Sequence, residues 1–340
     1  MKIRRHSLTY NFIGDAETGV TFRWGSSLRD NPILAPWPEL VDISISNHCS
    51  KGCIFCYRDS KADESFMRLD DYKYILQELN SPEWGNVFQI ALGGGEPLEH
   101  PQWREIIDAT RSYNVISNLT TNGNKLDNDA VNFLNGKIGA IAISISDLED
   151  INSDIINLLI ERTIKTNIHY VLSQRSLQQA INILLGAYDQ LLAGINSIIF
   201  LTHKPAGRAE NKDCLILNDD LKKFIGLIDR RCKIRVGFDA CFVPALLHFT
   251  KINPDFVDSC ECGFFSVFID EKLDVKPCSF ANNDNFTYNL KHYSFKEIWG
   301  SKYKIYRDSI INKCQNICNN RNNCKGACPY YKEINYCYTD

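Results

Sequence analysis

The sequence predicts an α/β protein whose C-terminal part is a small cysteine-rich domain. From residue 41 to about residue 240, short apolar runs alternate with amphipathic segments, a rhythm typical of parallel β/α units. After about residue 245 that rhythm stops, and closely spaced cysteines stand among short segments rich in Asn and Lys. We therefore expect a domain boundary near residues 245–258.

Residues 1–40 are expected to form an N-terminal extension that precedes the β/α units. Two stretches, Thr9–Ile13 and Gly19–Trp24, flank the turn-forming run Gly14-Asp15-Ala16-Glu17, which predicts a β-hairpin. A linker then leads into the first strand and contains three prolines, Pro32, Pro36 and Pro38.

The β/α region contains alternating strand and helix candidates. The strands are expected at Val41–Ser46, Val87–Leu92, Val115–Thr120, Ala140–Ile145, Asn167–Leu172 and Ser197–Thr202. The helices are expected at Leu69–Leu79, Trp103–Ser112, Asp127–Leu134, Ser153–Arg162 and Gln178–Leu192. A seventh apolar segment, Cys232–Phe238, follows the last strand candidate.

Composition limits the class of protein. With 340 residues, of which 44% are hydrophobic, the chain can bury a large core. Its net charge of −3 does not favour a surface that binds nucleic acid. The basic N-terminus is followed by polar residues where a signal peptide has an apolar stretch, and no apolar run approaches the length of a membrane span. We expect a soluble, cytoplasmic protein.

The 14 cysteines fall mostly into short-spaced groups, which in a chain without an export signal indicates metal ligation rather than disulfides. The first group is Cys49-x3-Cys53-x2-Cys56, directly after the apolar run Val41–Ile45. A [4Fe–4S] cube normally takes four thiolates, so this group would leave one iron free to bind a substrate or cofactor. A structural zinc site is disfavoured because no matching fourth ligand lies nearby in the sequence.

This group resembles the signature of the radical S-adenosylmethionine (radical SAM) enzymes, with Phe55 in its aromatic position. A second motif agrees: Val87–Leu92 leads into Gly93-Gly94-Gly95-Glu96-Pro97, where the family has Gly-Gly-Glu-Pro. The resemblance implies that the three cysteines hold the cube and that S-adenosylmethionine chelates its fourth iron. One electron from the cube then releases a 5′-deoxyadenosyl radical, which abstracts hydrogen from a substrate. An external electron donor such as flavodoxin or ferredoxin is implied as a partner.

The resemblance also implies a partial (β/α)6 barrel of the TIM type over residues 41–245, with the active site at the C-terminal ends of its strands. There, glycines let the backbone approach a ligand, and a carboxylate such as that of Glu96 can accept from an ammonium group. For each polar residue at this edge, an ordinary loop residue is the alternative. The residues expected to contact the cofactor are Phe55, Tyr57, Gly94, Gly95, Glu96, Pro97, Asn122, Ser144, Ser173 and Lys204. Lys204 begins the run Lys204–Ala209, which resembles a segment common in peptide-modifying members.

Residues 246–340 contain eight further cysteines and resemble the SPASM domain, the extension of radical SAM peptide maturases that holds auxiliary iron–sulfur clusters. Two departures stand out: Leu273 takes a glycine position, and Cys314 and Cys318 are spaced C-x3-C where the pattern has C-x2-C. The resemblance implies a first auxiliary [4Fe–4S] cluster on Cys260, Cys262, Cys278 and Cys328. It implies a second auxiliary cluster on Cys314, Cys318, Cys324 and Cys337. A pair of zinc sites is the alternative.

The expected reaction is an oxidative modification of a peptide or small protein, giving a crosslink, a thioether or an aldehyde. At the barrel rim, Asp239 could act as a general base, and Cys241 could donate a hydrogen atom, which would make the enzyme a peptide epimerase. The plain alternative for these two residues is a loop cap and a small packing residue. The sequence also leaves open a small-molecule dehydrogenase and, more distantly, a non-catalytic iron–sulfur electron-transfer protein.

Overall fold

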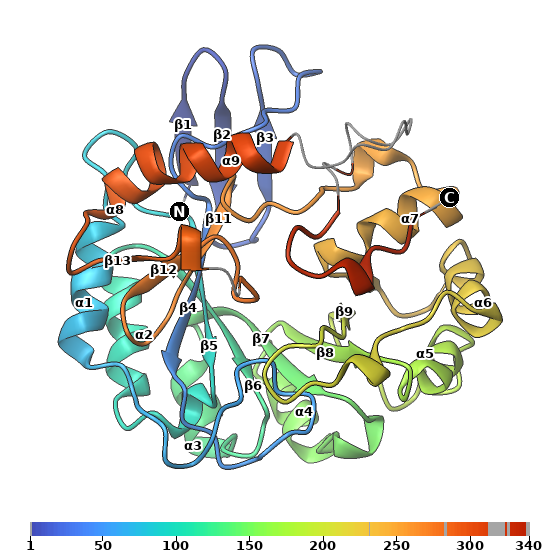
Figure 1. The fold of residues 1–340 in the computed structure, drawn as a ribbon. Coiled ribbons are helices and arrows are strands. Elements are labelled where there is room, and N and C mark those ends of the chain that lie inside the picture. The colour runs from blue at the N-terminus through green and yellow to red at the C-terminus, as the bar shows by residue number, and fades with distance from the viewer. Residues whose placement is uncertain (1, 231, 282–283, 312–323, 325–326, 338–340) are drawn as a thin grey trace.

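A ten-stranded sheet runs through the described part of the chain (Figure 1). The computed structural model describes residues 2–230, 232–281, 284–311, 324 and 327–337. The strand order is β10-β9-β8-β7-β6-β5-β4-β11-β12-β13. The strands are β4 (Leu40–Ser46), β5 (Gln89–Gly94), β6 (Ile116–Thr121), β7 (Ile138–Ile145), β8 (Thr166–Leu172), β9 (Ser197–Thr202), β10 (Val236–Phe238), β11 (Ser266–Ile269), β12 (Asp274–Lys276) and β13 (Tyr288–Asn289).

The strands from β4 to β10 are all parallel and are joined by helices on the outer side of the curved sheet (Figure 1). The connecting helices are α1 (Leu69–Glu78), α2 (Trp103–Ser112), α3 (Asn128–Leu134), α4 (Ser153–Glu161), α5 (Leu177–Leu184) and α6 (Asp219–Ile228). After β10, the described chain continues with α7 (Val243–Phe249), α8 (Phe295–Glu297) and α9 (Tyr303–Ile311). The predicted α/β fold with parallel β/α units is confirmed, and the expected strands occur close to their predicted bounds.

The fifth helix is shorter than predicted. The expected span Gln178–Leu192 is helical only as far as Leu184. Gly186 then adopts a φ of +85°, and the N–H of Ala187 donates to the carbonyl of Asn182, as in a Schellman helix end. Leu192 still packs in the core beyond this end, which explains why its apolar character suggested a longer helix.

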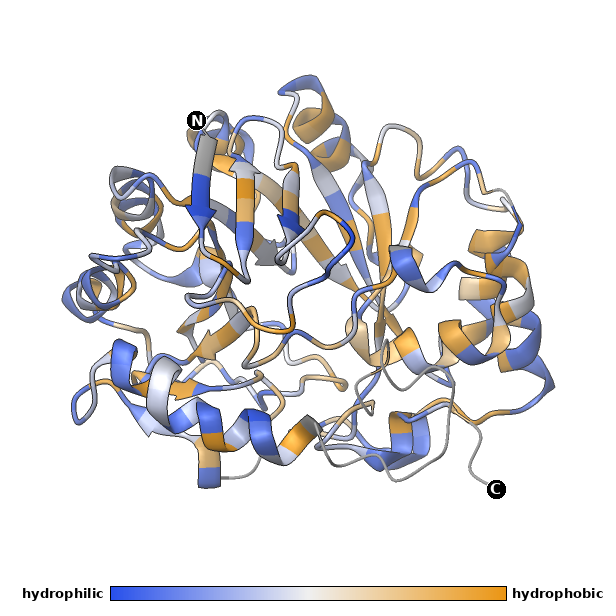
Figure 2. Ribbon diagram, turned by 90° about the horizontal axis from the view of Figure 1, so that it is seen from above, coloured by the Kyte–Doolittle hydropathy of each residue, from blue (hydrophilic) through white to orange (hydrophobic). Residues whose placement is uncertain are grey.

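Alternation along the strands determines which side chains face the interior of the barrel. In β4, Val41, Ile43 and Ile45 are buried in the main core with residues of the outer helices, so Asp42 lies on the opposite side. The same alternation in β8 places His169 on the inner side. Figure 2 shows hydrophobic residues along the central strands and many hydrophilic residues on the peripheral helices. None of the described helices is long and apolar enough to cross a membrane.

The cysteine-rich region joins the barrel sheet through β11. This strand pairs in parallel with β4, and β12 and β13 follow it in antiparallel order. The turn between β11 and β12 places Leu273 at a φ of +70°, a conformation that favours glycine. The carboxylate of Asp270 stabilises this turn by accepting from the N–H groups of Lys272 and Asp274, each at 3.0 Å. The leucine therefore keeps a left-handed turn at the position where the SPASM pattern has glycine.

The N-terminal segment forms its own antiparallel sheet, in which β1 (Lys2–His6) lies beside the hairpin of β2 (Asn11–Asp15) and β3 (Thr21–Trp24). The highly charged sequence of β1 carries no strand signal, so only the hairpin was predicted. The Arg5 side chain is buried and donates to the carbonyls of Trp37 at 2.8 Å and Asn86 at 2.7 Å. These bonds fix the small sheet to the barrel.

Candidate active site

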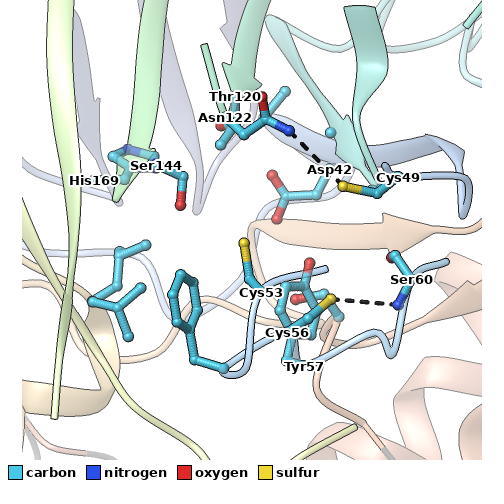
Figure 3. A pocket seen from close by; sticks show the side chains of 18 of the residues that line it. Asp42, Cys49, Cys53, Cys56, Tyr57, Ser60, Thr120, Asn122, Ser144 and His169 are labelled. Atoms are coloured by element: carbon cyan, nitrogen blue, oxygen red, sulfur yellow. Dashed lines mark hydrogen bonds between the residues drawn. The ribbon is translucent and has the colours of Figure 1, made fainter. Parts of the chain in front are cut away.

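A pocket of about 400 Å³ opens at the C-terminal ends of the barrel strands (Figure 3). It brings together most of the residues that the sequence indicated: Cys49, Cys53, Phe55, Cys56, Tyr57, Gly94, Gly95, Glu96, Asn122, Ser144, Lys204 and Asp239. Pro97, Ser173 and Cys241 do not line it. Ser173 bonds instead with Ser176 in the turn that precedes α5.

The cysteine loop follows β4 and places three thiols at one end of the pocket. The N–H of Ser60 donates to the sulfur of Cys56 at 3.4 Å, and the amide of Asn122 donates to that of Cys49 at 3.9 Å (Figure 3). Burial raises the pKa of the Cys49 and Cys53 thiols, because it disfavours the thiolate form. The three thiols can ligate iron, and N–H donors that point at sulfur tune an iron–sulfur cluster, so the loop fits such a group.

The glycines after β5 are needed for close contact between two backbones. A Cβ atom at Gly94 would lie 2.2 Å from the carbonyl oxygen of Ser46, and one at Gly95 would lie 2.1 Å from that of His48. The N–H of Gly95 donates to Ser46 at 2.6 Å, and the N–H of Glu96 donates to His48 at 2.8 Å. The Gly-Gly-Glu run therefore supports the start of the cysteine loop, in addition to lining the pocket.

The Glu96 carboxylate is buried, and most of its acceptor positions already take hydrogen bonds from the protein. One oxygen accepts from the Leu98 N–H at 3.0 Å and from the Thr121 hydroxyl at 2.6 Å; the other accepts from the Asn122 N–H at 2.7 Å. Burial raises the pKa of this carboxyl, and these three donors oppose the rise. A carboxylate has about four acceptor positions, so one position remains for an ammonium group of a ligand.

A second loop fastens the cysteine loop from the other side. Gly207 has a φ of +60°, and a Cβ atom there would lie 2.5 Å from the carbonyl oxygen of Cys56. The Arg208 side chain donates to the carbonyls of Cys53 at 3.1 Å and Ser60 at 2.7 Å. We call residues 204–209 the clasp. The sequence pointed to this run only through its resemblance, without indicating what it touches.

Lys204 and Asp239 form a buried ion pair at the wall of the pocket. Their charged atoms are 2.7 Å apart, and only 3% of the lysine side chain and 17% of the aspartate side chain is exposed. Burial disfavours the ammonium form, but the Asp239 carboxylate outweighs it and holds the pKa of Lys204 above its usual value. Asp239 also accepts from the Thr202 hydroxyl at 2.7 Å, so both of its oxygens have donors.

Two ionisable residues in the pocket were missed by the sequence analysis. Asp42 of β4 and His169 of β8 line the pocket, and no hydrogen bond or ion pair involves either side chain among the described residues (Figure 3). Burial raises the pKa of Asp42 to about 6 and lowers that of His169 to about 4. The available signal was a titratable residue inside an otherwise apolar strand, but only the fold shows which face of that strand is inward.

Four described cysteines of the C-terminal region gather beside the pocket wall. The thiols of Cys260 and Cys262 lie close enough to interact, as do those of Cys262 and Cys278. Cys328 lies close enough to Cys260 for their charges to interact. Cys241, expected at the rim of the barrel, is half-buried and lies beside Cys328 instead of lining the pocket. Cys324 and Cys337 are partly buried, and Cys314 and Cys318 lie outside the described residues.

A buried hydroxyl near these thiols suits a bound group whose sulfur atoms accept hydrogen bonds. The Tyr303 hydroxyl is buried, has no hydrogen-bond partner among the described residues, and lies close enough to Cys262 for their charges to interact. A buried hydroxyl without a partner is costly, and the sulfides of an iron–sulfur cluster would supply an acceptor.

Comparison with known proteins finds a family model that matches part of the chain. The model of the radical SAM superfamily matches residues 43–171. The mycofactocin maturase MftC of Mycobacterium tuberculosis is 22% identical over 323 residues, 88% of this chain and 78% of that protein. The PqqA peptide cyclase of Gluconobacter oxydans is 26% identical over 118 residues, 34% of this chain and 33% of that protein.

Two solved structures share the fold. Streptococcus suis SuiB bound to S-adenosylmethionine superposes with a TM-score of 0.74 at 14% identity, over 100% of this chain and 98% of that one. The structure of anSMEcpe with bound AdoMet superposes with a TM-score of 0.60 at 17% identity, over 86% of each chain. At these identities the superpositions establish a common architecture.

Proposed function

We propose that this chain, a radical SAM enzyme by its domain over residues 43–171, oxidatively modifies a peptide or small protein. The observation that carries the proposal is the extent of the pocket. It begins at Cys49, Cys53 and Cys56 and reaches Phe268, Ser279 and Phe280 of the C-terminal region. A substrate held there would lie between the first cluster site and the wall behind which the C-terminal thiols gather.

In this proposal the three loop cysteines hold the [4Fe–4S] cube, and the remaining acceptor position of Glu96 binds the amino group of S-adenosylmethionine. When bound, the cube and S-adenosylmethionine together supply the 5′-deoxyadenosyl radical that abstracts hydrogen. The residues of the chain orient and shield the site: the clasp and the Gly-Gly-Glu run fix the cysteine loop, and Tyr57 closes one wall by packing on Phe280 with ring centroids 4.3 Å apart.

The peptide substrate is supported by the relatives. MftC, related over 88% of this chain, is named a maturase, and the second relative is a peptide cyclase. SuiB has also been solved with its precursor peptide SuiA bound, in a structure that superposes on this chain with a TM-score of 0.68 at 13% identity.

The oxidative outcome is supported by the C-terminal thiols. In the proposal, Cys260, Cys262, Cys278 and Cys328 hold a first auxiliary cluster, and Cys314, Cys318, Cys324 and Cys337 hold a second. Four thiolates saturate each cube, so both would take up electrons and leave no iron for substrate. Because the Cys241 thiol lies beside Cys328 and does not line the pocket, its position favours this electron-transfer role over hydrogen donation to a substrate radical.

Anaerobic reconstitution tests the proposal. We expect about twelve irons per chain, falling to about eight in Cys53→Ala, as one open and two closed cubes require. The wild-type protein, reduced with dithionite, should cleave S-adenosylmethionine to 5′-deoxyadenosine, and Cys53→Ala should not. Cys232→Ala is the matched control, because this thiol lies outside both groups and donates its hydrogen bonds to the carbonyls of Leu184 and Arg230. Absence of cleavage by the iron-loaded wild type would overturn the radical SAM assignment of the site.

A further inference from the structure

The floor of the pocket carries an unpaired carboxylate. Asp42 lies beside Ala91 in the sheet, three residues before Gly94, so it is deeper in the barrel than the Gly-Gly-Glu run. Its other neighbour in the sheet is Phe268 of β11, which also lines the pocket. Figure 3 shows the Asp42 carboxylate directed into the pocket. No described residue donates a hydrogen bond to it or pairs with its charge.

We propose that Asp42 selects a peptide side chain with a cationic head, that of Lys or Arg. The assignment rests on the proposed peptide-modifying function and names the substrate side chain that the pocket accepts. An unpaired carboxylate that is shielded from water is unfavourable in the empty site. Such a residue is best explained if a ligand supplies the positive charge that pairs with it.

The charges around Asp42 favour a cation. Among the described residues that line the pocket, Lys204 is the only Lys or Arg, and Asp239 already neutralises it at 2.7 Å. Of the same described lining residues, Glu96 is the one remaining Asp or Glu, so it adds a second carboxylate to the lining of the pocket. Burial keeps His169 neutral at physiological pH, so this imidazole does not repel a cation. The loop thiolates add further negative charge when they hold iron.

The walls suit the long apolar stem of such a side chain. Phe268, Phe280 and Tyr57 form an aromatic surface on the C-terminal side of the pocket. Lys and Arg bury their methylene stems against apolar surfaces while the head finds polar partners, and aromatic faces attract the cation itself. A serine or threonine is too short to use both the aromatic wall and the carboxylate, and a glutamate would be repelled.

Binding of single capped residues tests the inference without knowledge of the full substrate. The iron-loaded protein with S-adenosylmethionine is titrated calorimetrically with Nα-acetyl-lysine amide, and separately with the norleucine and serine analogues. We expect the lysine compound to bind at least tenfold more tightly than norleucine amide, which has the same stem without the charge. Asp42→Asn should remove that difference. Asp63→Asn, an exposed carboxylate outside the pocket, is the matched control and should retain it.

The outcomes separate this inference from the proposed function. If the wild type cleaves S-adenosylmethionine but binds norleucine amide as well as lysine amide, the inference is wrong and the proposed function stands. If the serine compound binds more tightly than the lysine compound, the site accepts neutral hydrogen-bond donors, and the inference about Asp42 is also wrong. If the iron-loaded protein does not cleave S-adenosylmethionine at all, the proposed function itself fails. The comparison of the three compounds on the wild-type protein does not depend on whether any variant folds. Asp42→Ala is a second variant that removes the charge.

Discussion

At the scale of single residues, the pocket holds Asp42 and His169 in surroundings that disfavour their charged forms. Neither side chain has a described partner to offset its burial. Groups of this kind reduce the stability of a fold and are retained mainly at functional sites. Their cost should therefore be measurable as a pH dependence of the free energy of unfolding.

His169 should make the protein less stable in acid. The folded state holds the imidazole neutral down to a pKa of about 4, whereas the unfolded chain takes up the proton near the ordinary value of 6.5. Its contribution is thus complete above pH 6.5 and is lost as the pH falls towards 4. Between pH 7.5 and pH 4.5, wild type should lose roughly 2–3 kcal/mol more stability than His169→Gln, since one pKa unit corresponds to about 1.4 kcal/mol. Urea unfolding at both pH values measures this, and the exposed His292→Gln should behave like wild type.

At position 273, the glycine variant should be more stable than the alanine variant, the reverse of the usual order within a fold. Both substitutions lose the buried side chain and should destabilise the protein by roughly 2–5 kcal/mol. At a φ of +70°, however, alanine keeps the strain that glycine relieves, so Leu273→Gly should be more stable than Leu273→Ala by about 1 kcal/mol. Leu119, buried in β6 without a positive φ, is the control at which alanine should be the more stable of the two. The same order at both positions would contradict the turn conformation.

At the scale of elements, the cysteine loop is held between two glycine-containing runs. The Gly-Gly-Glu run after β5 bonds to its beginning, and the clasp after β9 bonds to its end. Neither contact involves a side chain that is expected to bind iron. The loop geometry therefore depends on close contact between its backbone and those of the two runs, which a side chain at the glycine positions would prevent.

Gly207→Ala should weaken iron binding at the loop without unfolding the chain. The new methyl group would meet the carbonyl oxygens of Cys56 and Tyr57, each 2.5 Å away, and would have to displace the loop. We expect about four irons fewer per chain after reconstitution, the content of one cube, with an unchanged circular dichroism spectrum. Gly226→Ala in α6 is the control, because nothing lies within 4 Å of its added Cβ. A full iron content in Gly207→Ala would show that the clasp does not position the cysteine loop.

At the scale of the whole molecule, buried and half-buried ion pairs join segments that are distant in the sequence. Arg58 of the cysteine loop lies 2.5 Å from Glu271 in the β11–β12 turn, and the glutamate also accepts from the hydroxyl of Ser44. Arg23 of β3 bonds to Glu39 at 3.2 Å and to Glu261 at 2.8 Å. These ion pairs therefore connect the N-terminal sheet, the barrel and the C-terminal region.

The Arg58–Glu271 pair should show strong coupling. Only 11% of the arginine side chain and 4% of the glutamate side chain is exposed, so removing one partner leaves the other charge buried. Arg58→Met alone should cost roughly 3–5 kcal/mol, while Arg58→Met with Glu271→Gln should cost clearly less than the sum of the single changes. The exposed pair Arg68 and Asp70 is the control and should show less than about 1 kcal/mol of coupling. Additive effects at Arg58 and Glu271 would contradict the pairing.

Local patterns predicted the β/α units and the first cysteine group, because the alternation of strand and helix candidates and the spacing of cysteines are both visible within short stretches of sequence. The pairing of β11 with β4 was not predictable from such patterns, since a strand of four residues acquires its partner only through the fold. Asp42 and His169 were missed because a single polar residue in an apolar strand does not reveal which face is inward. For Cys241, the sequence indicated the rim of the barrel but not the neighbouring Cys328.

The attachment of β11 to β4 has a consequence for synthesis of the chain. On the ribosome, β4 emerges early and can join β5 on one side, but its other edge stays unsatisfied until Ser266–Ile269 leaves the exit tunnel. An unpaired edge strand is a site for association between nascent chains. We therefore expect the growing polypeptide to engage chaperones until its last quarter is made, and fragments that stop before Ser266 to aggregate.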